Sequence, residues 1–306
     1  MGSTNSKTLS CHDLMKLINE TDAHKYICDE HDQIINMEIP GTFDVSMAAE
    51  NLKKNRYSDT PCFDHSRVIL QEDEKCGGYI NASYVDGFKH PKKYIVSQAP
   101  LETTTSDWWK MIWEQKIELI VMLCKLVEND KSQCYRYWSP VEGTTLEFGN
   151  LKVNTIKVDS TFENIRITSI VVTHKNGGQL KLTHFLYEKW QEHDISPAEP
   201  DFLDLVLMIK KYDRWALPQK SVNDWKMDSS CPILVHCNNG LGRSMTFCAV
   251  DILLSRFVKT RKVNPYSTFL NLRMQRYNCL SDINQYFFCY TVLFYYFTLY
   301  STLFQV

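Results

Sequence analysis

The residues best placed to do chemistry lie together at 233–244, where the sequence reads Ile-Leu-Val-His-Cys-Asn-Asn-Gly-Leu-Gly-Arg-Ser. An apolar run, two glycines and a helical spacing of apolar residues predict a strand, a tight loop and a helix. Backbone N–H groups at a helix N-terminus bind anions, and Arg243 adds a planar set of donors for a phosphoryl group. Cys237 lies at the base of this loop, where the same field favours a thiolate. We therefore expect a cysteine nucleophile that faces a bound phosphate.

A cysteine followed six residues later by an arginine is a weak signal by itself, because the chain contains eleven cysteines. The context is more specific, since His236, two glycines and Ser244 complete the pattern. The stretch resembles the signature of the protein tyrosine phosphatases, His-Cys-x-x-Gly-x-Gly-Arg-Ser/Thr, with Asn238 and Asn239 at the variable positions. We call residues 237–243 the phosphate loop.

The resemblance implies a role for each residue of this stretch. Cys237 attacks phosphorus, Arg243 stabilises the charge on the equatorial oxygens, and Ser244 hydrogen-bonds the sulfur as it departs. His236 acts through hydrogen bonds behind the nucleophile and does not itself react. The substrate phosphate is bound by the backbone of Asn238, Asn239, Gly240, Leu241 and Gly242.

Lys53-Lys54-Asn55-Arg56-Tyr57-Ser58-Asp59 could be an ordinary solvated helix end. Beside the signature it resembles the phosphotyrosine-recognition loop of the tyrosine-specific members. By that match, Tyr57 stacks on the substrate ring and Asp59 orients the peptide. A deep cleft of this kind would exclude phosphoserine, which is too short to reach Cys237.

The sequence Trp190-Gln191-Glu192-His193-Asp194 stands where the family places its mobile Trp-Pro-Asp acid loop. A carboxylic acid here would protonate the departing phenol oxygen. Glu192 is the expected acid and Asp194 a second candidate. Because the rigid proline is replaced by Gln191, we expect looser and slower closure. A solvated acidic loop without a catalytic role remains the alternative.

Further departures from the family occur after a predicted helix at 264–276. Arg273 and Arg276 match the family's Arg-x-x-Arg, but Asn278 replaces a glycine that opens the cleft, and Ser281 replaces a glutamine that positions the hydrolytic water. Gln285 matches the second glutamine of that motif and is expected to bind substrate or water. Gln133 stands where members usually carry a lysine, although Lys131 is close in sequence.

Periodicity predicts the remaining elements in outline. Strands are expected at 78–84, 94–100, 117–123, 135–138 and 180–187, with alternating strands through 146–172. Asn176-Gly177-Gly178 predicts a hairpin turn. Helices are expected at 104–115 and 198–212, and two short ones follow a capping box formed by Ser10 and Asp13.

Length and composition suit one large domain, since the 306 residues are 44% hydrophobic and 23% charged. We expect residues 1–45 to form an N-terminal helical segment that packs on a phosphatase-like catalytic domain at 46–306. The resemblance implies a single α/β domain, a twisted mixed sheet with helices on both faces.

Charge and cysteine usage limit the partners. The net charge of −2 does not point to nucleic acid, and scattered cysteines without CxxC pairs favour reduced thiols in the cytoplasm. No metal or cofactor is expected. Gly2 lies in an N-myristoylation pattern, so membrane contact is expected only if it is acylated. The uncharged stretch 287–304 is a buried terminal helix or a membrane tail.

Three functions remain open at this level. The first is hydrolysis of phosphotyrosine in proteins, with reduced activity because the acid loop and Ser281 diverge. The second is a pseudophosphatase that binds and shields phosphotyrosine, and the third is a phosphatase for non-protein substrates such as RNA 5′ ends, against which Tyr57 counts. The divergent loops look similar to the tyrosine-phosphatase-like proteins of wasp bracoviruses, which would imply interference with host phosphotyrosine signalling.

Overall fold

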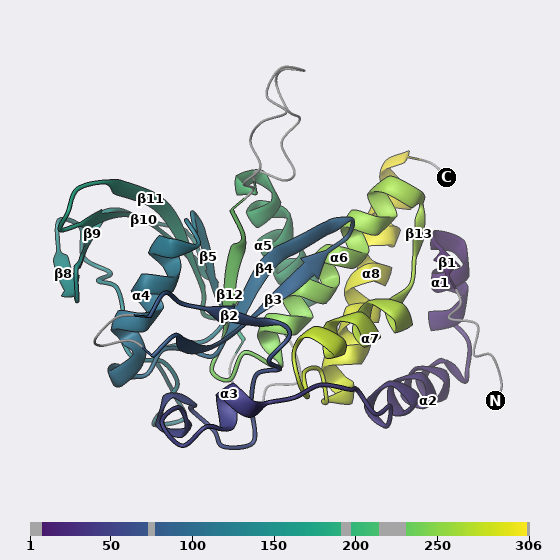
Figure 1. Cartoon of the computed structure of the whole chain (residues 1–306). Coiled ribbons are helices and arrows are strands. Elements are labelled where there is room, and N and C mark those ends of the chain that lie inside the picture. Colours follow the sequence, from purple (N-terminus) through teal and green to yellow (C-terminus); the bar gives the residue numbers. More distant parts are fainter. Residues whose placement is uncertain (1–7, 73–76, 191–196, 214–230, 305–306) are drawn as a thin grey trace, which may run out of the picture.

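The computed structural model describes residues 8–72, 77–190, 197–213 and 231–304. Its centre is a nine-stranded mixed sheet (Figure 1). The strand order is β2 (Arg67–Ile69), β3 (Tyr79–Gly87), β4 (His90–Ser97), β12 (Ile233–His236), β5 (Leu119–Met122), β11 (Gln179–Tyr187), β10 (Ile165–His174), β9 (Leu151–Phe162) and β8 (Thr145–Phe148). The expected α/β architecture with a mixed sheet is confirmed.

The four central strands β4, β12, β5 and β11 run parallel, and the outer strands pair antiparallel. All four residues of β5 and all four of β12 are buried, as expected for parallel strands covered on both faces. The carboxyl ends of β12 and β5 therefore meet at one edge of the sheet, where the phosphate loop begins.

Helices cover both faces of the sheet. On one face α6 (Arg243–Thr260) lies on β4 and β12 and is surrounded by α5 (Glu199–Tyr212), α7 (Pro265–Gln275) and α8 (Ile283–Phe304) (Figure 1). On the other face α4 (Thr105–Glu114) places Trp108 against the ring of His236 at 5.0 Å. The helix after the phosphate loop is thus buried between the sheet and other helices, which fixes where the loop ends.

The N-terminal helices α1 (Cys11–Ile18) and α2 (Ala23–Ile35) pack on α8. The Ser10–Asp13 capping box is present at the start of α1. A short β1 (Leu9–Ser10) pairs with β13 (Lys262–Val263), and a small hairpin joins β6 (Val127–Glu128) to β7 (Lys131–Ser132). The helix α3 (Asp44–Met47) and the 3-10 turns η1 (Leu52–Lys54) and η2 (Glu102–Thr104) complete the elements.

The expected strand at 135–138 is wrong, because this segment forms no strand and does not join the sheet. Its backbone bonds elsewhere: Tyr135 N–H donates to the carbonyl of Pro100 at 3.1 Å, and the carbonyl of Tyr137 accepts the indole N–H of Trp109 at 2.9 Å. The terminal stretch forms part of α8, which packs on α5 and α6. Among the described residues, none of the helices has both the length and the apolarity needed to span a bilayer.

Candidate active site

The phosphate loop connects the end of β12 to the first residue of α6, as the sequence predicts. The segments that follow the neighbouring strands β5 and β4 hold the start of the loop. The N–H of Leu123 donates to the carbonyl of His236 at 2.9 Å, and the N–H of Ala99 donates to the carbonyl of Asn238 at 2.8 Å. The loop therefore lies at the carboxyl edge of the parallel strands, where open α/β sheets bind ligands.

Cys237 lies inside the loop and only 2% of its surface is exposed. Its Sγ accepts the backbone N–H of Gly240 at 3.3 Å. The side-chain Oδ1 of Asn239 lies 3.7 Å from the sulfur and accepts the N–H of Leu241 at 2.9 Å. The amide of Gly240 thus points at the sulfur from inside the loop.

Gly240 is required by this turn. Its φ is +71°, and a Cβ added there would lie 2.3 Å from the carbonyl oxygen of Ser97. A Cβ on Gly242 would lie 2.6 Å from the side-chain Nε2 of Gln285. The two glycines therefore allow the loop to approach β4 on one side and Gln285 on the other.

Arg243 is 6% exposed and its Nη1 makes three hydrogen bonds. Glu128 accepts two of them, at 2.8 and 3.1 Å, and the carbonyl of Trp190 accepts the third at 2.8 Å. Burial alone would lower the pKa of the guanidinium, but Cys237, Cys124 and Glu128 outweigh burial and raise it. Arg243 is therefore a fixed cation, and its bonds to described residues leave Nε and Nη2 for an oxyanion.

His236 is fully buried behind the nucleophile. Its Nε2 lies 2.7 Å from the hydroxyl of Tyr137, and its Nδ1 lies 3.2 Å from the carbonyl of Cys237. The same hydroxyl lies 2.7 Å from Nε2 of His184. Burial lowers the pKa of His236 to about 3, against the opposing effect of its bond to the Cys237 carbonyl. Both rings are neutral, because burial also holds the pKa of His184 well below its usual value.

A neutral His236 has one N–H, and the carbonyl of Cys237 can only accept. The proton must then be on Nδ1, so Nε2 accepts the hydroxyl proton of Tyr137 and the Tyr137 oxygen accepts from Nε2 of His184. The order His184 to Tyr137 to His236 to the Cys237 carbonyl satisfies each contact. It orients His236 to support the backbone at the nucleophile, which agrees with a role that does not involve direct reaction.

Ser244 is fully buried, and its hydroxyl has no hydrogen-bond partner among the described residues. The expected contact between Ser244 and the sulfur is therefore not formed in this state. Asn238 is also buried, and its amide donates to the side-chain and backbone oxygens of Gln133, the latter at 3.3 Å. Gln133 thus contacts the phosphate loop, whereas Lys131 is exposed.

Tyr57 and Asp59 lie in an exposed loop that is tied to the site indirectly. The N–H of Arg56 donates to the side chain of Gln98 at 2.9 Å, and Gln98 directly precedes Ala99, which bonds the phosphate loop. Tyr57 is 40% exposed and so is available to a ligand. The structure brings this loop to the same sheet edge, and among the described residues neither side chain hydrogen-bonds Cys237.

Arg276 is fully buried and joins β3 to the phosphate loop. Its guanidinium donates to Oδ1 of Asn81 at 2.6 Å, to Oγ of Ser83 at 3.2 Å and to the carbonyl of Asn239 at 3.4 Å. Arg273 instead donates to the carbonyl of Cys279. The paired arginines therefore have structural roles that hold the phosphate loop and the segment after α7.

The segment after α7 carries the sequence departures. Asn278 adopts a left-handed φ of 52°, a conformation that asparagine tolerates better than most residues. Ser281 is exposed, while Gln285 is half-buried in the first turn of α8 beside Gly242. Of the two candidate water-positioning residues, Gln285 is the one whose side chain is shown to approach the phosphate loop.

The predicted acids Glu192 and Asp194 lie outside the described residues, as do Gln191 and Gly2. The residue before them is placed. Trp190 packs against Phe288 of α8, with ring centroids 5.6 Å apart, and its carbonyl bonds Arg243. Trp190 is therefore held close to Arg243.

The sequence analysis missed three site residues. Glu128 contacts Arg243 across 115 residues of sequence and Tyr137 contacts His236 across 99, while His184 contacts Tyr137 across 47. No spacing rule relates residues so distant in sequence. The motif around Arg243 could only have indicated that a buried arginine needs an acidic partner somewhere.

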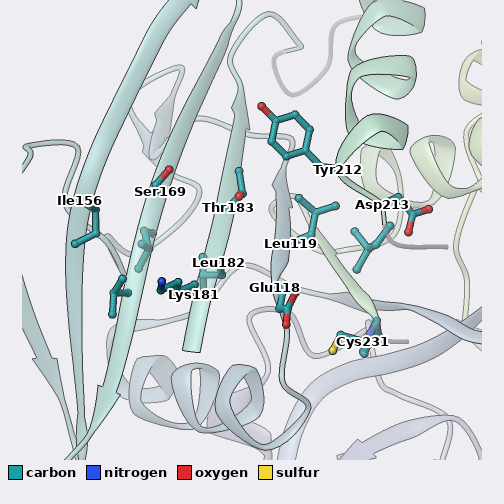
Figure 2. Close-up of a pocket in the computed structure, with 14 residues that line it drawn as sticks. Glu118, Leu119, Ile156, Ser169, Lys181, Leu182, Thr183, Tyr212, Asp213 and Cys231 are labelled. Carbon is teal, nitrogen blue, oxygen red and sulfur yellow. The ribbon is translucent and has the colours of Figure 1, made fainter. Parts of the chain in front are cut away.

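The cavity in Figure 2, of about 480 Å³, lies at the opposite end of the parallel strands. Leu119 and Ile233, the first residues of β5 and β12, line it, whereas the phosphate loop follows the last residue of β12. Asp213 and Cys231 also line it and border residues outside the described ranges. It is therefore separate from the site built around Cys237.

Comparison with known proteins agrees with this geometry. The family model for the protein-tyrosine phosphatases matches residues 51–295. The chain is 36% identical to tyrosine phosphatase H2 of Microplitis demolitor bracovirus, over 94% of this chain and 88% of that protein. It is 38% identical to tyrosine phosphatase-like protein J1 of the same virus, over 96% and 97%. Tyrosine-protein phosphatase non-receptor type 9 of Rattus norvegicus is 31% identical over 93% of this chain and 48% of that protein.

Proposed function

Because this chain belongs to the protein-tyrosine phosphatase family, we propose that it hydrolyses phosphotyrosine in proteins through a phosphate ester of Cys237. The observation that carries the proposal is the position of Cys237 Sγ, 3.3 Å from the N–H of Gly240, inside a loop that ends at Arg243. The bracoviral relatives support action on the phosphotyrosine signalling of an infected host.

The first proposed step is attack of the Cys237 thiolate on phosphorus. The S–P bond forms and the P–O bond to the tyrosine breaks, while the loop amides and Arg243 stabilise the equatorial oxygens. Glu192 is proposed to give its proton to the leaving phenolate oxygen, with Asp194 as the alternative. Tyr57 is proposed to hold the substrate ring and Asp59 the peptide backbone.

The second proposed step is hydrolysis of the cysteinyl phosphate. Water attacks phosphorus, its proton passes to the acid-loop carboxylate, and the sulfur leaves as a thiolate that the Ser244 hydroxyl can stabilise. Gln285 is proposed to orient this water. Because Ser281 is too short to hold it in the manner of glutamine, we propose that this step limits turnover.

A role in binding phosphotyrosine without turnover is the second candidate, and Ser281 together with Gln191 favours it. Gln191 replaces a family residue of the acid loop, and Ser281 replaces one that positions the hydrolytic water. The residues of the phosphate loop, in contrast, match the family pattern. Such a protein would shield phosphotyrosine from other phosphatases.

Stopped-flow measurement with an aryl phosphate separates the candidates. A burst of phenol followed by slow turnover is expected for an enzyme limited at hydrolysis. No phenol release at high protein concentration would leave only binding. Glu192→Ala and Asp194→Ala, tested in parallel, identify the acid as the residue whose loss removes the burst; if neither does, the acid assignment is wrong.

Capture of a phosphotyrosyl peptide tests the binding site independently of turnover. Cys237→Ser should still capture the peptide, because the amides and Arg243 remain. Arg243→Ala should lose capture, and unchanged affinity in this variant would contradict the proposed phosphate contact.

Membrane association is proposed only if Gly2 is acylated. The ten cysteines among the described residues are all free thiols, which supports a proposed place of action in the cytoplasm.

A further inference from the structure

His31 of α2 links the N-terminal helical segment to the phosphate loop. The ring is 2% exposed, and its Nε2 lies 3.0 Å from the carbonyl oxygen of Leu280, 249 residues later in the chain. A carbonyl can only accept, so Nε2 donates. The N–H of Leu280 in turn donates to the carbonyl of Leu241 at 3.2 Å. The backbone of Leu280 thus connects α2 to the phosphate loop.

Leu280 needs this support because of its conformation. Its φ is +55°, in the left-handed region that non-glycine residues seldom adopt, and its side chain is 1% exposed. The surrounding contacts must therefore hold the residue in place. His31 and Leu241 supply hydrogen bonds to the two polar groups of its backbone.

The segment held in this way determines where α8 begins. Three residues after Leu280 the helix starts, and Gln285 in its first turn lies against Gly242. Leu280 is followed in sequence by Ser281, the position that diverges from the family. A displaced Leu280 would therefore move Gln285 relative to the phosphate loop.

A second contact between α2 and α8 does not reach this segment. Glu30 accepts hydrogen bonds from the hydroxyls of Tyr286 and Tyr290, the latter at 2.6 Å, and the ring of His31 lies 5.3 Å from that of Tyr286. Glu30 thus attaches one helix to the other, whereas the imidazole N–H of His31 holds the backbone before α8. The two functions can be separated by mutation.

We propose that His31 is a positioning residue for hydrolysis of the cysteinyl phosphate, although it lies outside the family match at 51–295. The inference rests on the proposed function, in which Gln285 orients the attacking water. His31 touches neither phosphate nor water. It fixes Leu280, and through it the distance between Gln285 and the phosphate loop. Formation of the cysteinyl phosphate does not use Gln285, so the first step should not depend on His31.

The test is stopped-flow hydrolysis of p-nitrophenyl phosphate by the full chain and three variants. His31→Phe keeps a ring beside Tyr286 but removes the donor, and His31→Gln replaces the ring by an amide donor at nearly the same reach. Tyr290→Phe is the matched control, because it removes an α2–α8 hydrogen bond that does not involve Leu280. Melting temperatures measure the loss of stability separately.

His31→Phe should lower steady-state turnover about fivefold, the factor that one lost hydrogen bond represents, and leave the burst rate unchanged. His31→Gln should restore turnover to within about twofold, and Tyr290→Phe should leave both phases unchanged. Equal losses of burst and turnover, or equal effects of His31→Phe and Tyr290→Phe, would show a merely structural role and overturn the inference. An unchanged turnover in His31→Phe overturns it as well. Turnover without a burst in the unmodified chain would show that hydrolysis of the cysteinyl phosphate is not limiting and would overturn the inference alone, whereas no phenol release at all would refute the proposed function and the inference with it.

Discussion

Nη1 of Arg243 lies 2.8 Å from Oε1 of Glu128, a carboxylate in the β6–β7 hairpin whose side chain is fully buried. The arginine that is proposed to bind the phosphate is thus held by a strand pair that contributes nothing to the phosphate loop itself. Removing one member of a buried ion pair leaves the other charge without compensation, which costs more than the pair contributes.

Glu128→Ala should therefore lower both stability and catalysis. We expect a loss of about 3 kcal/mol in the free energy of unfolding, and a decrease in kcat/KM of about a hundredfold as Arg243 shifts from the phosphate. Urea unfolding and hydrolysis of an aryl phosphate measure the two effects. Glu147→Ala is the control, because its ion pair with Lys152 at 3.0 Å is solvent-exposed and should change neither quantity measurably. Wild-type kcat/KM in Glu128→Ala would contradict the role assigned to the pair.

Gly240→Ala should abolish the phosphate loop, because the added Cβ would meet the carbonyl of Ser97 at 2.3 Å. Gly143 has a similar φ of +76°, but no atom lies within 4 Å of a Cβ there. Both substitutions cost about 1 kcal/mol for the left-handed backbone, and only Gly240→Ala adds a collision with backbone. Vanadate affinity should decrease at least about a hundredfold in Gly240→Ala and stay unchanged in Gly143→Ala. Equal affinities in the two variants would show that the close approach to β4 is unimportant.

Stability should fall as the pH is lowered below 6.5. His236 has a folded-state pKa of about 3 and His184 one well below its usual value, so between these values and 6.5 the unfolded chain binds protons that the folded chain does not. The contribution is fully present above pH 6.5 and is lost as the pH falls toward 3, at about 1.4 kcal/mol per pH unit for each histidine. Urea unfolding from pH 7.5 to 4.5 measures the slope. His184→Gln keeps a donor for Tyr137 and should reduce the slope of unfolding free energy against pH by about 1.4 kcal/mol per pH unit, the contribution of one histidine. An unchanged slope would mean that His184 is charged in the folded protein.

Ser281→Gln should accelerate turnover by restoring a water-positioning amide. We expect steady-state turnover to rise about tenfold and the burst rate to stay constant, because only the hydrolysis step uses this position. Stopped-flow measurement with an aryl phosphate distinguishes the two phases, and Ser281→Ala should behave like the unmodified protein. A faster burst in Ser281→Gln, or no change in either phase, would mean that hydrolysis is not limited at this residue.

The local part of the site could be predicted from the sequence. Cys237, Gly240, Gly242 and Arg243 lie within seven residues, and their backbone requirements are short-range, so the strand, loop and helix follow from spacing and from the freedom of glycine. The departures at Gln191 and Ser281 are equally visible, since they concern which side chain occupies a known position. What these side chains contact depends on the fold.

Tertiary structure decided the rest, because burial and hydrogen bonding join residues that no periodicity relates. The segment 135–138 has strand composition, yet it bonds Trp109 and Pro100 in place of a neighbouring strand, and this places the Tyr137 hydroxyl between two histidines. Likewise the charge of Arg243 demanded a buried anion, but only the position of the β6–β7 hairpin beside the start of α6 made Glu128 that anion. A sequence records which groups need partners, and the folded chain selects them by bringing distant segments within hydrogen-bonding distance.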